Sequence, residues 1–216
     1  MKRNLIRIFL TVLVVALSAS APVQAASHHT KAGPALTKSA VDLRIAMRQL
    51  WDDHMLYTRN FIISSLAGLD DAGKIAERLL RNQDDIGNAI KPIYGEEAGK
   101  KLSSLLRDHI LIAADIVKAA KAGDNDGVAK GQERWRANAD EIALFLSKAN
   151  PNWNADTMKN MLYKHLATTT DEVVSRLKKD WAADIAAYDA GHAHMMMFAD
   201  MLTDGIVKQF PSKFEK

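Results

Sequence analysis

The sequence has no cysteine, and it has few helix-breaking residues, with 11 glycines and 5 prolines among 216 residues. Without thiols the chain cannot form a disulfide, a thiolate zinc site, an iron–sulfur cluster or a cysteine nucleophile. Neither a glycine-rich phosphate-binding loop nor a G-x-S-x-G motif is present. Stability must therefore come from the packing of the core, and long stretches are free to form helices.

Residues 1–25 have the layout of a bacterial secretory signal peptide. A basic start with Lys2 and Arg3 precedes an apolar run over residues 8–17, and the small-residue pattern VQA ends at Ala25. The apolar run is shorter than the about 20 residues that a membrane-spanning helix needs. We therefore predict cleavage after Ala25, no membrane span in the mature chain, and a periplasmic or secreted protein.

Cleavage there would leave a chain of balanced charge. The sequence has 29 Lys and Arg against 26 Asp and Glu, and three of the basic residues lie in the predicted signal peptide. No acidic residue lies there, so the mature chain has a formal net charge of zero. This balance gives no support for a nucleic-acid partner, and we expect none.

After a flexible segment over residues 26–37, apolar residues recur with a helical period and no segment alternates as a strand does. Asp and Asn residues precede several of the periodic runs, as is typical of helix N-caps. We predict a single all-α domain over residues 38–212. Its expected helices cover about residues 38–66, 71–90, 96–121, 126–148, 155–178 and 181–208.

A weak internal repeat divides these helices into hairpins. WDDHMLYTRNFI (51–62) resembles LRDHILIAADIV (106–117), and NQDDIGNAI (82–90) resembles NADEIALFL (138–146). A third, more diverged unit would begin near KHL (164–166). Because a single helical hairpin cannot bury its apolar face alone, we expect a bundle of about six helices built from two or three hairpin repeats.

Three histidines occupy the centre of apolar helical stripes: His54, His109 and His165. The residues three, four and seven positions from His109 are all apolar: Leu102, Leu105, Leu106, Ile112, Ala113 and Ile116. Other polar residues interrupt or border the apolar faces of the partner helices. These are Asn82, Asn138, Asp184 and His192.

The functional interpretation of this set is a transition-metal or small-ligand site inside the bundle. Neutral imidazoles and a carboxylate suit zinc, copper, iron or nickel, and bundle cores are known locations for such sites. The predicted metal ligands are His54, His109, His165, Asp184 and His192. Imidazoles more than about 10 Å apart would not share one ion. Neither an E-x-x-H pair nor an H-E-x-x-H motif supports the prediction.

The alternative is that the buried histidines are structural. Each imidazole would then be paired within its hairpin: His54 with Asn82, His109 with Asn138, and His165 with Asp184. The protein would on this view be a periplasmic interaction or chaperone-like protein. An enzyme that uses the same site, such as a metal-dependent oxidase or hydrolase, is a third hypothesis, and no catalytic residue is assigned to it.

Two smaller metal hypotheses concern other stretches. In YDAGHAHMMMFAD (188–200), Met195 is expected in the core, whereas His194 and Met197 should point away from it. Methionine is an ordinary core residue, although thioethers also suit Cu(I). Cleavage after Ala25 or the next residue would place His28 or His29 third in the mature chain, where it would allow square-planar binding of Cu(II) or Ni(II).

Over about residues 40–212 the chain resembles a family of uncharacterised exported bacterial all-helical proteins. The segments that carry the resemblance are LWDDHMLYTRNFIISSL, LLRNQDDIGNAIKPIYG, DHILIAADIVKAAKAGD, RANADEIALFLSKANPNW and ADMLTDGIVKQFP. The resemblance implies an exported helical protein. It implies no activity, cofactor or catalytic residue.

Overall fold

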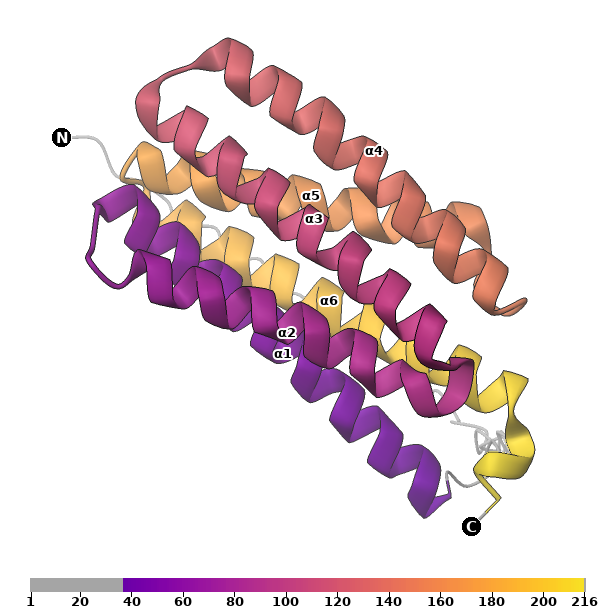
Figure 1. Ribbon diagram of the computed structural model, residues 1–216. Coiled ribbons are helices and arrows are strands. Elements are labelled where there is room, and N and C mark those ends of the chain that lie inside the picture. Colours follow the sequence, from indigo (N-terminus) through magenta and orange to yellow (C-terminus); the bar gives the residue numbers. More distant parts are fainter. Residues whose placement is uncertain (1–36, 216) are drawn as a thin grey trace, which may run out of the picture. The chain divides into compact units, whose positions relative to one another are not determined.

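Six long helices form the computed structural model, which describes residues 37–215 (Figure 1). They are α1 (Lys38–Ala67), α2 (Ala72–Tyr94), α3 (Glu96–Ala122), α4 (Asn125–Ala149), α5 (Ala155–Leu177) and α6 (Trp181–Gln209), followed by the short 3₁₀ helix η1 (Pro211–Lys213). The described residues contain no strand, so the predicted all-α bundle is confirmed. The predicted signal peptide and the N-terminal metal site at His28 or His29 lie outside the described residues.

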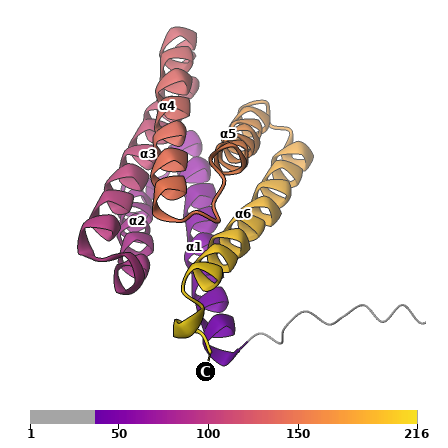
Figure 2. The same cartoon turned by 90° about the vertical axis from the view of Figure 1, so that its right-hand side faces the viewer.

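The helices pack in the order of the chain, and the last returns to the first. Each helix contacts the next one, and α6 lies against α1, so the bundle closes on itself. Figure 2 shows α2, α3 and α4 on one side of α1 and α5 and α6 on the other. None of the helices in residues 37–215 is long and apolar enough to cross a membrane.

The helix boundaries follow from local chemistry. Asp124, Asn154 and Asp180 accept a hydrogen bond from a backbone N–H of the first turn of α4, α5 and α6, which confirms the expected acidic and amide N-caps of these helices. The expectation is wrong for α2, because Asp71 precedes this helix without a side-chain cap hydrogen bond. At the end of α1, Gly68 adopts a φ of 72°, a left-handed conformation that favours glycine. The α2 helix continues four residues past its expected end at residue 90, although it contains Pro92.

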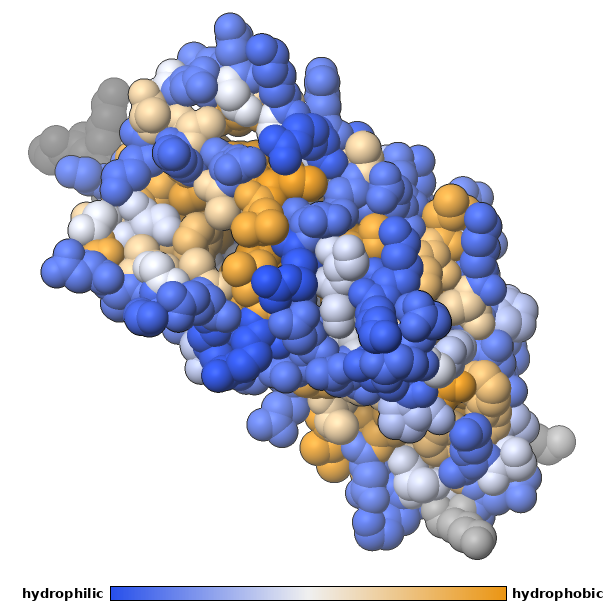
Figure 3. Space-filling view, viewed as in Figure 1, coloured by the Kyte–Doolittle hydropathy of each residue, from blue (hydrophilic) through white to orange (hydrophobic). Residues whose placement is uncertain are grey.

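The core confirms most of the predicted apolar faces. Met195 and Phe198 of α6 are buried, and Met197 is exposed. The prediction for His194 is wrong: this residue is only 9% exposed, because its face of α6 packs against α5. On the face drawn in Figure 3, hydrophilic residues cover most of the surface and hydrophobic side chains gather in separate patches.

A close approach of two helix backbones joins the first hairpin to the second. A Cβ atom added to Gly87 of α2 would lie 2.5 Å from the carbonyl oxygen of Gly99 of α3, and one added to Gly99 would lie 2.6 Å from that of Gly87. Real Cβ atoms do not approach backbone atoms this closely. The contact between α2 and α3 therefore requires glycine at both positions.

We predict that Gly87→Ala lowers the free energy of unfolding by about 1–3 kcal/mol, because the added methyl group must push α2 and α3 apart. The measurement is urea unfolding followed by circular dichroism. Gly73→Ala, in the first turn of the same helix and with open space around it, is the matched control. It should leave stability unchanged or raise it by up to about 1 kcal/mol. Equal effects of the two substitutions would contradict the close contact.

Candidate functional site

Three histidines meet in the middle of the bundle, one from the first helix of each hairpin. His54 of α1, His109 of α3 and His165 of α5 are only 1–3% exposed. The ring centroids of His54 and His165 are 5.5 Å apart, and those of His109 and His165 are 5.9 Å apart. These distances lie well within the 10 Å limit for a shared site. We call His54, His109 and His165 the histidine cluster.

The three hairpins repeat one interhelical hydrogen bond beside this cluster. Side-chain N–H groups on the second helix of each hairpin donate to the backbone carbonyl four residues before the clustered histidine. The bonds join Asn82 to Leu50 at 2.9 Å, Asn138 to Leu105 at 3.0 Å, and His194 to Met161 at 2.8 Å. The packing therefore supports three hairpin repeats, with His194 in the position that asparagine holds in the first two.

The predicted pairing of asparagine with histidine is confirmed in one hairpin and wrong in another. Nδ1 of His109 lies 2.7 Å from Oδ1 of Asn138. The amide oxygen only accepts, so this Nδ1 carries the proton and the lone pair of His109 lies on Nε2. In the first hairpin, Oδ1 of Asn82 instead accepts a bond from Gln83 at 3.1 Å. The difference arises because Gln83 is also buried and directly adjacent.

Two of the clustered rings have an unpaired nitrogen. Nδ1 of His54 and Nδ1 of His165 are buried and form no hydrogen bond of good geometry, although the side chain of Gln83, whose Oε1 is also unpaired, interacts with His54. A buried polar atom without a partner costs about 1–3 kcal/mol. The centre of the bundle therefore contains two imidazole nitrogens that a further ligand or a water molecule would satisfy.

The histidine cluster is uncharged at neutral pH. Burial lowers the pKa of His54 to about 3, with a further decrease from His109, and burial lowers the pKa of His109 to about 4. The pKa of His165 is also lowered, first by burial and then by the neighbouring histidines. All three rings are therefore neutral imidazoles, the form that binds metal ions.

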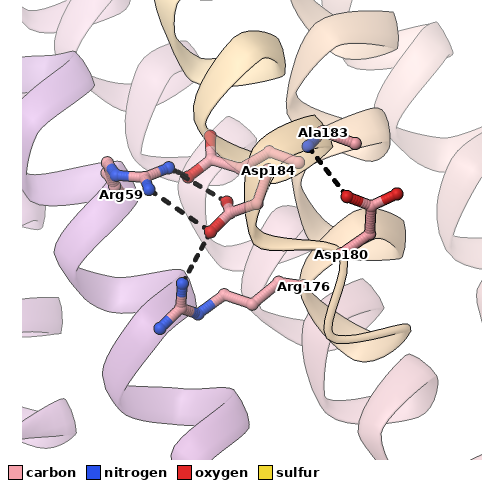
Figure 4. A network of polar contacts seen from close by, with 6 residues as sticks. Arg59, Arg176, Asp180, Ala183 and Asp184 are labelled. Carbon is pink, nitrogen blue, oxygen red and sulfur yellow. Dashed lines mark hydrogen bonds and ion pairs between the residues drawn. The ribbon is translucent and has the colours of Figure 1, made fainter.

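Asp184 belongs to a different polar group, which Figure 4 shows. Its carboxylate accepts hydrogen bonds from Arg176 at 2.7 Å and from Arg59 at 3.1 and 3.3 Å. Arg59 also donates to Glu172 at 2.7 Å. The predicted pairing of Asp184 with His165 is wrong, because two arginines from α1 and α5 compensate the buried carboxylate instead. We call Arg59, Arg176, Glu172 and Asp184 the arginine cluster.

Burial raises the pKa of Glu172 to about 7, although the adjacent Arg59 opposes this shift. Only one oxygen of Glu172 is bonded to Arg59, whereas Asp184 is bonded to both arginines. Within the arginine cluster, the negative charge of Asp184 is therefore compensated by two arginines and that of Glu172 by one.

The structure also keeps His192 apart from the histidine cluster. Its side chain is 33% exposed, and its Nε2 lies 2.6 Å from Oδ1 of Asp52 on α1. Sequence reasoning placed His192 beside the buried face of this helix and His194 away from it, whereas the structure buries His194 and leaves His192 partly exposed. A usable signal was present, because residues 82, 138 and 194 are evenly spaced by 56 positions. Of the five predicted metal ligands, His54, His109 and His165 lie together, and Asp184 and His192 do not.

Within residues 37–215, no three His, Asp or Glu side chains point their ligating atoms at a common point as a metal ion requires. The unpaired nitrogens of His54 and His165 and Nε2 of His109 would reach a common metal ion only after some of the rings turn. Comparisons with protein-family models, with curated proteins and with solved structures gave no match. The resemblance to exported helical proteins therefore stays a prediction.

We predict that the free energy of unfolding falls as the pH falls from about 6.5 to 4. In this range an unfolded histidine binds a proton, whereas buried His54 and His109 do not. Each such histidine contributes a loss of about 1.4 kcal/mol per pH unit. Glu172 acts in the opposite direction, since its folded-state pKa is raised, and one carboxyl only partly offsets three histidines. Urea unfolding at several pH values measures the slope.

The variant that tests the source of this slope is His109→Gln, which should reduce it by about 1 kcal/mol per pH unit. Leu105→Ala is the matched control, one turn earlier on α3 and equally buried. This substitution should lower the free energy of unfolding by the same amount at every pH, so the dependence of stability on pH should keep the wild-type slope. A slope that His109→Gln leaves unchanged would show that this histidine is not the source.

Proposed function

We propose that the protein binds one transition-metal ion through His54, His109 and His165. One observation carries the proposal: equivalent positions of three hairpins bring together three neutral imidazoles, two of which have a buried nitrogen without a partner. Buried imidazoles are costly unless each nitrogen is satisfied, and a metal ion satisfies lone pairs that no donor reaches.

Metal binding would require three imidazole nitrogens of the histidine cluster to point at one ion. Imidazole nitrogens bind zinc at about 2.0–2.1 Å. His109 would bind through Nε2, because its Nδ1–H is held by Asn138, an arrangement that commonly orients metal-binding histidines. The rings of His54 and His165 would have to turn; Nδ1 of His165 loses no hydrogen bond when it does, and His54 gives up at most its interaction with the side chain of Gln83.

The donor set limits the choice of metal. Three imidazoles without thiolate suit zinc, copper, iron or nickel and do not suit calcium or magnesium. Three protein ligands on a tetrahedral ion would leave one position for water or a substrate, as in catalytic zinc sites. The predicted signal peptide places this binding in the periplasm or outside the cell.

A second candidate function is an interaction or chaperone-like protein whose histidines are structural. The observation that favours it is an exposed apolar group around the turn between α5 and α6: Val174, Leu177, Trp181 and Ile185. Exposed apolar patches are typical of protein interaction sites. In that case a water molecule would satisfy the cluster.

The test is elemental analysis of the mature protein purified from the periplasm without chelator, and again after incubation with zinc, copper, iron and nickel. We expect close to one metal ion per chain in the wild type and a loss of at least tenfold in affinity in His54→Gln and His165→Gln. Bound Co(II) should give the visible absorption of a four-coordinate site.

His192→Gln is the matched control, because His192 lies on the surface against Asp52. It should bind metal as the wild type does. Circular dichroism of each variant separates loss of the site from loss of the fold. A wild type that stays free of all four metals would reject metal binding and favour the structural role.

A further inference from the structure

Gln83 of α2 is a fully buried polar side chain beside the histidine cluster, and the proposed metal site gives it no role. It is 0% exposed. Its amide nitrogen donates to the backbone carbonyl of Leu79 at 2.8 Å and to Oδ1 of Asn82 at 3.1 Å. A glutamine amide has two N–H donors, so both are used. Its one acceptor, Oε1, is buried and unpaired.

The orientation of this amide follows from a chain of hydrogen bonds that begins at a helix backbone. The carbonyl of Leu50 only accepts, so Asn82 must direct its N–H2 group at that atom, which lies 2.9 Å away. Oδ1 of Asn82 is therefore the atom that faces Gln83. Because Oδ1 and the Leu79 carbonyl are both acceptors, Gln83 must direct its own N–H2 group at them. Its Oε1 is left as a fixed, unused acceptor.

The group that can use this acceptor is the ring of His54. Nδ1 of His54 is buried and unpaired, and the side chains of His54 and Gln83 interact. The two helices are already joined at this level, because Asn82 bonds to the carbonyl of Leu50, one turn before His54. An imidazole Nδ1 can carry a proton, whereas an amide oxygen can only accept one. A bond between these two atoms would satisfy both, and each would otherwise carry the cost of an unpaired buried group.

The second hairpin shows the same arrangement in a completed form. There, one residue performs two tasks: Asn138 donates to the carbonyl of Leu105 at 3.0 Å, and its Oδ1 lies 2.7 Å from Nδ1 of His109. In the first hairpin these tasks fall to two adjacent residues. Asn82 bonds to the helix carbonyl, and Gln83 supplies the amide oxygen for the histidine.

The third hairpin lacks this arrangement. His194 holds the position of Asn138 and donates from Nε2 to the carbonyl of Met161 at 2.8 Å. Nδ1 of His165 has no hydrogen-bond partner among the described residues. Two rings of the histidine cluster are thus paired with an amide oxygen, and the third ring is free to adjust its orientation.

We propose that Gln83 is a positioning residue of the histidine cluster: its Oε1 accepts the Nδ1–H of His54 and so holds the lone pair of His54 on Nε2. His109 presents its lone pair on the same nitrogen. The inference rests on the proposed metal site and assigns Nε2 as the nitrogen through which His54 binds. Without Gln83, the proton of His54 can move to Nε2 and block that nitrogen. Residues that orient a metal-binding histidine in this way contribute about 10- to 100-fold to affinity.

The first measurement is the tautomer of each histidine in the metal-free protein. Two-bond ¹H–¹⁵N correlation spectra of ¹⁵N-histidine-labelled protein distinguish a protonated ring nitrogen from an unprotonated one, and His54→Gln and His109→Gln assign the signals. We expect Nδ1–H in both His54 and His109. Gln83→Met removes the acceptor at nearly constant volume, and it should shift the proton of His54 toward Nε2 and leave His109 unchanged. Asn138→Leu is the reciprocal control and should change His109 alone.

The second measurement is zinc affinity, by competition with a chelator. Gln83→Met should bind zinc at least tenfold more weakly than the wild type. Leu79→Ala is the matched control, because this residue lies one turn earlier on α2, is equally buried, and keeps the backbone carbonyl that Gln83 uses. It should lower stability, yet keep the wild-type tautomer of His54 and bind zinc within threefold of the wild type. Circular dichroism confirms that each variant is folded, and Gln83→Leu replaces Gln83→Met if the latter does not fold.

Three results would overturn the positioning role of Gln83. The first is a wild type in which Nε2 of His54 carries the proton. The second is a tautomer of His54 that the substitutions of Gln83 leave unchanged. The third is a changed tautomer with zinc affinity equal to that of Leu79→Ala. Each of these results is compatible with a wild type that binds zinc. A wild type that binds no zinc would instead reject the proposed function, so the two failures are distinguishable.

Discussion

Three side-chain hydrogen bonds to helix carbonyls fix the relation between the two helices of each hairpin. The carbonyls of Leu50, Leu105 and Met161 already lie in the hydrogen-bond ladders of their helices, and each accepts a second bond from the facing helix. A buried donor that slid by one residue would lose this bond and remain unpaired. The bonds therefore set the register in which the clustered histidines meet at one level of the bundle.

The fold could be predicted from the sequence because its signals are local. Apolar periodicity and N-caps such as Asp124 determine the helices, and the stripe around His109 identifies its buried face. The partners of Asp184 could not be predicted, since Arg59 lies 125 residues earlier and only packing brings it close. The face of α6 was also misassigned around His194, because the surrounding run of methionine and alanine is apolar on every side.

The core contains two clusters of buried polar side chains, and each cluster avoids the cost of an unpaired buried charge in a different way. The histidine cluster avoids charge, since burial lowers each pKa until the rings are neutral. The arginine cluster keeps its charges, because Arg59 and Arg176 compensate Asp184 directly. A neutral imidazole still has a lone pair, whereas a compensated carboxylate has its oxygens occupied. This difference explains why the histidine cluster, and not the arginine cluster, is the better candidate for binding a further ligand.

The glycine contact between Gly87 and Gly99 has a consequence for how the bundle moves. It joins the first hairpin to the second at backbone distance, so we expect little movement between α2 and α3. The contact between α4 and α5 is less extensive than that between α2 and α3. Thermal fluctuations that widen the bundle should therefore concentrate between α4 and α5.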